Sequence, residues 1–182
     1  RNVSAAGMKS VRFGSLALLS STNTSASALP VALWNGIMDE MAAQNLHLVV
    51  ARLPDAQLTD ETLIPKILRE YMADGLLIDY THAIPQAMIA LIEKYRLPAI
   101  WINVKRDYDC VHPDDFAAGQ SMGRFLLQQK HRQIAFAINA DEPQHKLLHY
   151  SVSDRLEALQ NEIVSAGGKV EMVSPPDMGT FD

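Results

Sequence analysis

The sequence is poor in cysteine, which limits how the chain can be held together. Its 182 residues contain a single cysteine, Cys110, so no disulfide can form within the chain. A lone thiol fits a reducing compartment. Because Cys110 stands at the edge of a predicted strand and not at a helix start, we interpret it as a packing residue and not as a nucleophile.

Long apolar runs and clusters of basic residues are also missing. No run approaches the roughly 20 apolar residues that a membrane-spanning helix needs, so no membrane segment is predicted. The chain has 16 Lys and Arg residues against 21 Asp and Glu residues, for a net charge of -5. Affinity for DNA comes from clustered basic side chains. These residues are therefore not expected to bind DNA by themselves.

The usual motifs of catalysis and of cofactor binding are not found in the sequence. The loop after the first predicted strand, SSTNTSASALP (20–30), has no glycine and cannot be a phosphate-binding loop. No serine lies in a nucleophile-elbow motif. His145 and His149 are four residues apart and leave a zinc site as an alternative, although histidines of a solvated loop are the simpler interpretation. We expect no catalytic residue, no cofactor and no metal.

What the sequence has is a regular alternation of strand-like and helix-like segments. Apolar runs predict strands at 11–21, 47–53, 75–80, 98–104, 133–139 and 169–173. Segments with helical spacing lie between them, at 29–45, 60–75, 83–96 and 151–168, and a further helix begins after Asp115. In that helix Ala118, Met122 and Phe125 share one face. This alternation predicts an α/β fold with parallel sheets covered by helices on both faces.

Ligands of parallel α/β sheets bind beyond the carboxyl ends of the strands. This rule selects the loops at 20–28, 79–83, 103–107, 112–115 and 139–153. Two adjacent acids lie in one of these loops, in the stretch VHPDDFAAG (111–119). Pro113 blocks a helix before it, Asp114 suits the N-cap, and Asp115 favours the positive helix start. Helix capping alone therefore explains both acids.

Motifs spread over residues 12–173 resemble the effector-binding core of the LacI/GalR family of transcription regulators, which is itself similar to periplasmic sugar-binding proteins. They are NGIMDEMAAQNLHLVVA (35–51), YMADGLLID (71–79), LPAIWIN (97–103), VHPDDFAAG (111–119), LLQQKHRQIAFA (126–137) and SVSDRLEAL (151–159). Some positions depart from the family pattern. Asn45 and Lys130 replace glycines, and Leu29 and Pro30 stand where an aromatic pair often stacks on a purine or sugar.

The resemblance implies a two-lobed fold of the periplasmic-binding-protein type (type I). Residues 1–10 would be a linker or disordered tail, residues 11–111 the N-terminal subdomain, and residues 112–182 the first part of the C-terminal subdomain. We expect a piece of a longer chain, without the family's helix-turn-helix headpiece and with the second lobe incomplete.

The resemblance also implies a ligand site between the lobes. Asp114 matches an aspartate that faces the family's ligand cleft, and Arg155 matches an arginine that grips ligand hydroxyls or carboxylates. A solvent-exposed arginine near a helix start is the alternative for Arg155. The predicted ligand-binding residues are Asn23, Asp79, Asp114, Asn139, Ser151 and Arg155.

The function that follows is that of the ligand-sensing domain of a LacI-family regulator. A small sugar or sugar derivative would be the effector, and operator DNA would bind to the headpiece. The protein would be a cytoplasmic homodimer with no membrane contact and no enzymatic activity. The alternative is a periplasmic-type sugar-binding protein for transport. An α/β enzyme is the weakest hypothesis, because no nucleophile, metal cluster or phosphate loop is found in the sequence.

Overall fold

The computed structural model describes residues 12–24, 26, 27, 29–70, 73–138 and 149–173. The chain divides into two compact units, Arg1–His112 and Pro113–Asp182. The predicted tail at 1–10 and the candidate Asn139 lie outside the described residues.

Unit 1 is built on a parallel sheet of five strands in the order β2-β1-β3-β4-β5. Their bounds are β1 Ser15–Ser21, β2 His47–Leu53, β3 Gly75–Asp79, β4 Ala99–Ile102 and β5 Cys110–Val111. The central strands β1 and β3 are almost completely buried, as expected of a parallel sheet between two layers. The predicted α/β class is confirmed. The two-residue strand β5 was not predicted, because it is too short to show a pattern.

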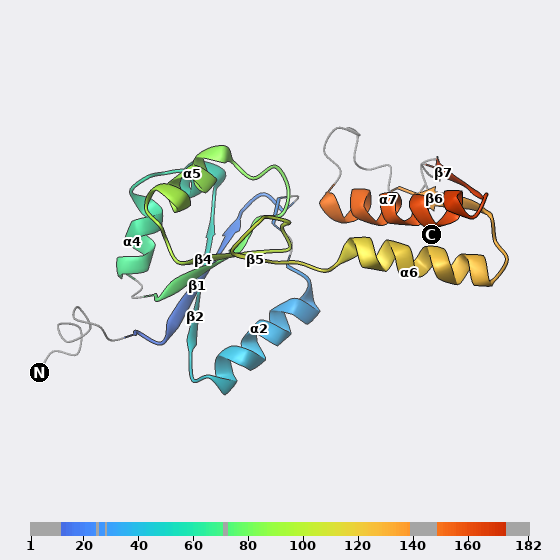
Figure 1. Ribbon diagram of the computed structural model, residues 1–182. Helices are drawn as coiled ribbons and strands as arrows, with labels where there is room; N and C mark the ends of the chain where they lie inside the picture. Colours follow the sequence, from blue (N-terminus) through green and yellow to red (C-terminus); the bar gives the residue numbers. More distant parts are fainter. Residues whose placement is uncertain (1–11, 25, 28, 71–72, 139–148, 174–182) are drawn as a thin grey trace, which may run out of the picture. The chain divides into compact units, whose positions relative to one another are not determined.

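Helices lie on both sides of this sheet (Figure 1). They are α2 Val31–Ala43, α3 Asp55–Leu58, α4 Leu63–Glu70 and α5 Gln86–Lys94. The chain moves from β1 to β2 through α2, and in the opposite direction from β2 to β3 and from β3 to β4. Right-handed crossovers therefore place α2 on one face and α3, α4 and α5 on the other. The short helix α3 was not predicted.

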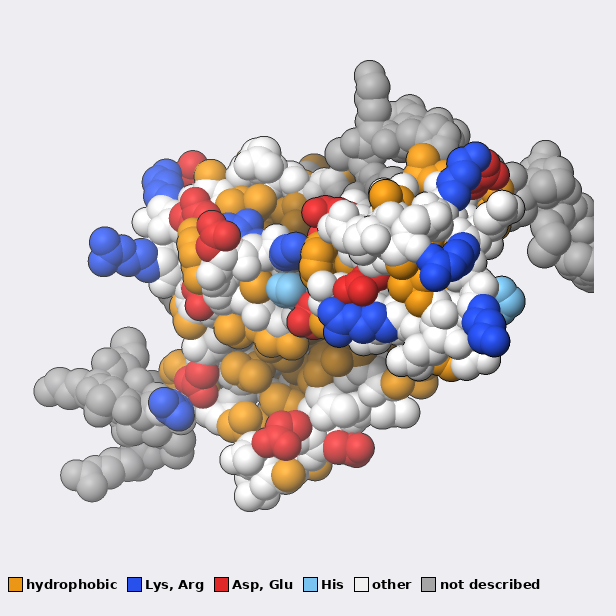
Figure 2. All heavy atoms as spheres, turned by 45° about the vertical axis from the view of Figure 1, so that its right-hand side comes forward, with side chains coloured by type: hydrophobic (Ala, Val, Ile, Leu, Met, Phe, Trp, Pro, Cys, Tyr) orange, Lys and Arg blue, Asp and Glu red, His pale blue; other side chains and the backbone are white. Residues whose placement is uncertain are grey.

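The main core of unit 1 lies on the α3–α5 side of the sheet. Leu19, Ile78 and Trp101 of the sheet pack there with Leu58 and Met88 of the helices, and all are at most 2% exposed. The other face is less covered, because Met41 is the one buried side chain of α2 among the residues that the structure describes. Apolar side chains consequently reach the surface in several places (Figure 2).

Unit 2 contains two helices and a two-stranded parallel sheet. Its elements are α6 Asp115–Gln128, β6 Gln133–Ala137, α7 Tyr150–Ser165 and β7 Lys169–Val173. The bounds of β7 are those predicted. The helix predicted at 151–168 is α7, and the chain turns after it at Gly167, whose φ of 76° suits glycine.

Helices α6 and α7 lie side by side (Figure 1) and approach each other closely at two glycines of α6. A Cβ at Gly119 would lie 2.4 Å from the carbonyl oxygen of Arg155, and one at Gly123 would lie 2.7 Å from Cβ of Glu162. The buried residues of α6 are Asp115, Gly119 and Gly123. Ala118, Met122 and Phe125, whose spacing predicted the helix, are exposed. Backbone contact at the two glycines selects another face of α6 for packing against α7.

Asn45 and Lys130, which replace family glycines, lie in left-handed backbone. Asn45 has a φ of 53° and Lys130 a φ of 65°, each just after a helix. Asparagine tolerates this conformation better than most residues, whereas lysine is strained in it. The expectation that Lys130 occupies a position suited to glycine is confirmed.

No helix in the described part of the chain is long and apolar enough to cross a membrane.

Candidate functional site

A buried carboxyl group ends the central strand of unit 1. Asp79 is the last residue of β3 and is 4% exposed. Its Oδ1 atom is buried and has no hydrogen-bond partner within the described residues. Burial raises the pKa of Asp79 above its ordinary value of 3.8, because a carboxylate loses solvation there. Asp79 is thus a polar group whose unused oxygen can accept a hydrogen bond.

The loop after β1 is fastened to the end of β3. The hydroxyl of Ser27 donates to the carbonyl oxygen of Asp79 and accepts from the backbone N–H of Ser21 at 2.9 Å. The backbone N–H of Asn23 donates to Oγ of Ser21 at 2.9 Å. The side chain of Asn23 is exposed. These bonds bring the loop that carries Asn23 to the edge of the sheet at which Asp79 lies.

A second polar group at this edge was missed by the sequence analysis. Ser21 donates a hydrogen bond of 2.5 Å to Oδ1 of Asp55, the first residue of α3. Burial, followed by a hydrogen bond with Asp55 and the charge of Asp55, raises the pKa of Tyr80 to about 12. Tyr80 therefore stays protonated as a hydrogen-bond donor at neutral pH. The position of Tyr80 directly after Asp79, at the end of a strand, could have indicated from the sequence that it lies at this edge.

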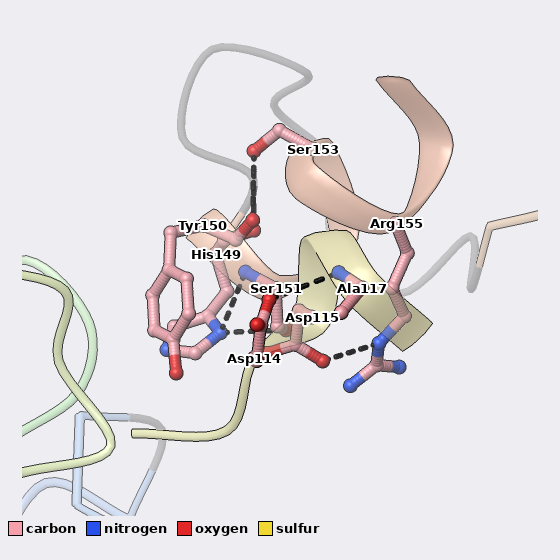
Figure 3. A network of polar contacts seen from close by, with 8 residues as sticks. All are labelled: Asp114, Asp115, Ala117, His149, Tyr150, Ser151, Ser153 and Arg155. Atoms are coloured by element: carbon pink, nitrogen blue, oxygen red, sulfur yellow. Dashed lines mark hydrogen bonds and ion pairs between the residues drawn. The ribbon is translucent and has the colours of Figure 1, made fainter. Parts of the chain in front are cut away.

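Asp114 caps the first helix of unit 2, as predicted. Its Oδ1 atom accepts a hydrogen bond of 2.9 Å from the backbone N–H of Ala117 (Figure 3). The side chain is exposed. Asp114 therefore does the capping job that the local sequence predicts, and its role in ligand binding stays a prediction.

The partner of Arg155 is the neighbouring acid, Asp115. The Nε atom of Arg155 lies 2.6 Å from Oδ1 of Asp115. The Asp115 side chain is 3% exposed and that of Arg155 is 50% exposed, so the pair joins a buried anion to a cation that reaches solvent. Oδ2 of Asp115 is buried and, within the described residues, has no partner. Arg155 is neither wholly solvated nor at the helix start: it lies in the second turn of α7.

The position of Asp115 in the sequence predicted a role at the helix start but not its pairing with Arg155. Asp115 lies one and two turns before Gly119 and Gly123, on the helix face that touches α7. Asp115, Gly119 and Gly123 follow one another at intervals of four residues and so share one face of α6. The two glycines leave room for another helix on this face, so the pattern indicates that the carboxylate lies at a helix contact.

His149 is the N-cap of α7, and its ring contacts the candidate Ser151. Nδ1 of His149 lies 2.8 Å from Oγ of Ser151 and accepts from the backbone N–H of Ser151 at 3.4 Å. The ring of His149 lies 4.3 Å from that of Tyr150, centroid to centroid. Histidine is not among the residues preferred at N-caps, so the sequence offered no signal for this role.

The structure places the predicted residues in two sets. Asn23 and Asp79 belong to the carboxyl edge of the sheet of unit 1, while Asp114, Ser151 and Arg155 lie at the N-cap of α6 and in the first two turns of α7 in unit 2 (Figure 3). The described residues contain no group of three His, Cys, Asp or Glu side chains that could hold a metal ion. His145, half of the alternative zinc pair, lies outside them.

A hollow of about 710 Å³ lies at the other end of the sheet of unit 1. Leu16, Gly75, Leu77, Pro98 and Ile100, at the amino ends of the strands and the loops before them, form much of its wall. It does not include the predicted ligand-binding residues of unit 1. The side chains that line it also include those of Asp74, Glu93, Arg96, Tyr108 and Asp109.

In a parallel α/β sheet, ligands bind beyond the carboxyl ends of the strands, which is where Asn23 and Asp79 lie in unit 1. The chain belongs to the family described as periplasmic binding proteins and sugar binding domain of LacI family, whose model matches residues 17–146. The expectation that the protein is not an enzyme is confirmed by this membership. None of the curated proteins matches the chain.

Solved structures with the same fold include regulators and a transport protein. The Lac repressor dimer bound to operator and an anti-inducer is 16% identical, with a TM-score of 0.66 over 96% of this chain and 59% of that one. A LacI family transcriptional regulator from Bifidobacterium animalis subsp. lactis is 18% identical, with a TM-score of 0.63 over 90% of this chain and 57% of that one. A periplasmic sugar-binding protein of an ABC transporter from Legionella pneumophila is 13% identical, with a TM-score of 0.62 over 88% of this chain and 60% of that one.

The chain spans about three fifths of the length of these structures. At sequence identities as low as these, the likeness shows that the proteins share a fold.

Proposed function

We propose that the chain is the ligand-sensing domain of a LacI-type transcription regulator and that its effector is a small sugar or sugar derivative. The observation that carries the proposal is the pair formed by Arg155 and Asp115. Asp115 holds Nε of a half-exposed guanidinium at 2.6 Å. This bond leaves the two Nη groups to donate to hydroxyl oxygens, in an orientation set before the ligand arrives.

The acids near these loops favour a ligand that donates hydrogen bonds. Asp79 and Asp115 each have a buried oxygen without a partner among the described residues, and Asp114 is exposed beside Asp115. Hydroxyl groups of a neutral sugar would donate to such oxygens. A phosphate or a carboxylate would be repelled by them. The proposed effector is therefore a neutral sugar.

Regulation would follow from binding energy that differs between two states of the protein. A ligand shifts the equilibrium toward the state that it binds more tightly. The protein would act as a cytoplasmic homodimer that binds operator DNA through a helix-turn-helix headpiece outside these residues. The acidic net charge of -5 supports placing DNA recognition elsewhere.

A sugar-binding protein for transport is the second candidate. It is supported by the likeness to the Legionella pneumophila periplasmic protein, which matches nearly as well as the regulators do. Both functions use the same sugar site. A helix-turn-helix preceding these residues in the natural protein would favour the regulator, and a signal peptide would favour transport.

A thermal-shift screen with neutral pentoses and hexoses, their phosphates and their uronic acids tests the proposal. A ligand at 100 times its Kd should stabilise the native state by about 2.7 kcal/mol. The expected result is a shift with a neutral sugar and none with its phosphate or uronate. A shift with the anionic sugars alone would contradict the assignment of the acids, and turnover of a bound sugar would contradict a binding function.

A further inference from the structure

Ser151 takes its hydrogen-bonding character from the ring of His149. A backbone N–H can only donate, so the bond from the N–H of Ser151 identifies Nδ1 of His149 as an acceptor. The neutral ring must then carry its proton on Nε2. The hydroxyl of Ser151, 2.8 Å from the same Nδ1, has to donate its proton to it. The oxygen of Ser151 is left as an acceptor toward a ligand.

Protonation of His149 reverses this arrangement. A proton on Nδ1 removes the lone pair that accepts from the N–H of Ser151, so α7 loses its cap. Nδ1–H then donates to Oγ of Ser151, which fills an acceptor position of that oxygen and releases the hydroxyl proton to point elsewhere. The same serine changes from an acceptor toward the ligand into a donor, by the gain of one proton on the neighbouring ring.

Charged groups around His149 act on this protonation in both directions. Asp114 and Asp115, at the start of α6, lie beside the first turn of α7 (Figure 3) and favour the positively charged ring. The positive end of α7 disfavours it, as does Arg155 of the same helix. Asp154 and Glu157 are the other charged residues in the first two turns of α7. The ring of Tyr150 lies tilted by 50° to that of His149. These groups set the pH at which the ring gains its proton, but they do not change what that proton does to the bonds.

We propose that His149 is a positioning residue that makes ligand binding by Ser151 depend on pH. Histidine is the side chain whose charge changes most readily near physiological pH. Hydroxyls of a sugar that donate to Ser151 would bind well above this transition and more weakly below it. The proposal rests on the proposed sugar site, whereas the bond between His149 and Ser151 can be examined without any sugar.

Nitrogen NMR of the histidine rings tests the bond in the ligand-free protein. At pH 8 the Nδ1 atom of His149 should show the chemical shift of an unprotonated ring nitrogen, and the amide signal of Ser151 should move as the pH falls to 5. A protonated Nδ1 at pH 8 would overturn the proposal. This result stands whether or not a sugar binds, so failure of the sugar site is distinguished from failure of the cap.

Affinity across the pH range tests the coupling to the ligand. The probe is the neutral pentose or hexose that gives the largest thermal shift, titrated between pH 8 and pH 5.5. Loss of one neutral hydrogen bond should weaken binding about two- to tenfold at pH 5.5. His149→Asn caps a helix without titrating, so its affinity should vary less with pH. His131→Asn, an exposed histidine after α6, is the control and should keep the wild-type profile.

The comparison also separates the role in positioning from a role in folding. Equal pH profiles for the wild type and His149→Asn would overturn the proposal. A flat wild-type profile would do so as well. His149→Ala should be less stable than either protein, because it has no cap. Alanine cannot be protonated, so the melting temperature of this variant should lack the pH dependence that comes from His149.

Discussion

The guanidinium of Arg155 is held at its Nε atom by a carboxylate that is almost completely buried, that of Asp115, 2.6 Å away. The bond joins the first residue of α6 to the second turn of α7, next to the point where a Cβ on Gly119 would collide with the backbone of Arg155. A residue predicted to bind ligand is thus also part of the contact between two helices.

Arg155→Ala should consequently destabilise the ligand-free protein. Removal of the guanidinium leaves Asp115 buried with both oxygens unpaired, and an unsatisfied buried group costs about 1–3 kcal/mol. Urea unfolding at pH 7 measures the loss. The double variant Asp115→Asn, Arg155→Ala should recover part of it, because the uncompensated charge is gone. Equal stability of wild type and Arg155→Ala would show that the ion pair contributes nothing to the fold.

The capping role of Asp114 can be tested separately from the role of its charge. Asp114→Ala removes the bond to the N–H of Ala117 and should cost about 1 kcal/mol of stability, whereas Asp114→Asn keeps an acceptor and should cost little. Thermal unfolding gives both values. If Asp114 also contacts the sugar, both variants bind it more weakly. Affinities equal to wild type would reduce Asp114 to a cap.

Lys130 offers a stabilising substitution. Its φ of 65° is strained for lysine, and Lys130→Gly should raise the free energy of unfolding by about 1 kcal/mol. Ala118→Gly, at an exposed position inside α6, is the matched control and should lower it by a similar amount. Chemical denaturation of the two variants should move the midpoint in opposite directions. A loss of stability in Lys130→Gly would argue against the left-handed backbone.

Asp79 should make stability fall as the pH rises. The pKa of Asp79 is raised from 3.8 by burial, so the folded state favours the neutral acid. Its contribution is present below pH 3.8 and is lost as the pH rises through the raised value. Asp79→Asn, which has no charge, should therefore melt higher than wild type at pH 7, with a difference that shrinks toward pH 4. A difference that grows as the pH falls would contradict the assigned burial.

Much of the fold could be predicted from local patterns. The bounds of β2 and β7 agree with the strand-like runs at 47–53 and 169–173, whose β-branched and apolar residues favour extended backbone. Asp114 was predicted as a cap from Pro113 and the position of the acid alone. The strain at Lys130 followed from a family glycine that this chain has replaced.

The remaining features depend on contacts that a single segment does not reveal. The face of α6 that packs against α7 is set by glycines where the two backbones meet, so the apolar spacing of Met122 and Phe125 predicts the helix but does not identify this face. The partner of Arg155 is 40 residues away in the chain. His149 caps α7 although histidine has no general preference for that position. In the candidate site, residue types could be predicted, but their partners could not.

The most direct test of the account is a calorimetric titration of the neutral sugar selected by thermal shift into the wild-type protein and Arg155→Ala. Loss of a charged hydrogen-bond partner should cost roughly 1.5–3 kcal/mol, which corresponds to an affinity about 10- to 150-fold weaker. Arg124→Ala, which breaks an exposed ion pair with Glu162, is the control and should keep the wild-type affinity. An Arg155→Ala variant that is folded and binds the sugar as tightly as wild type would contradict the assignment of the ligand site.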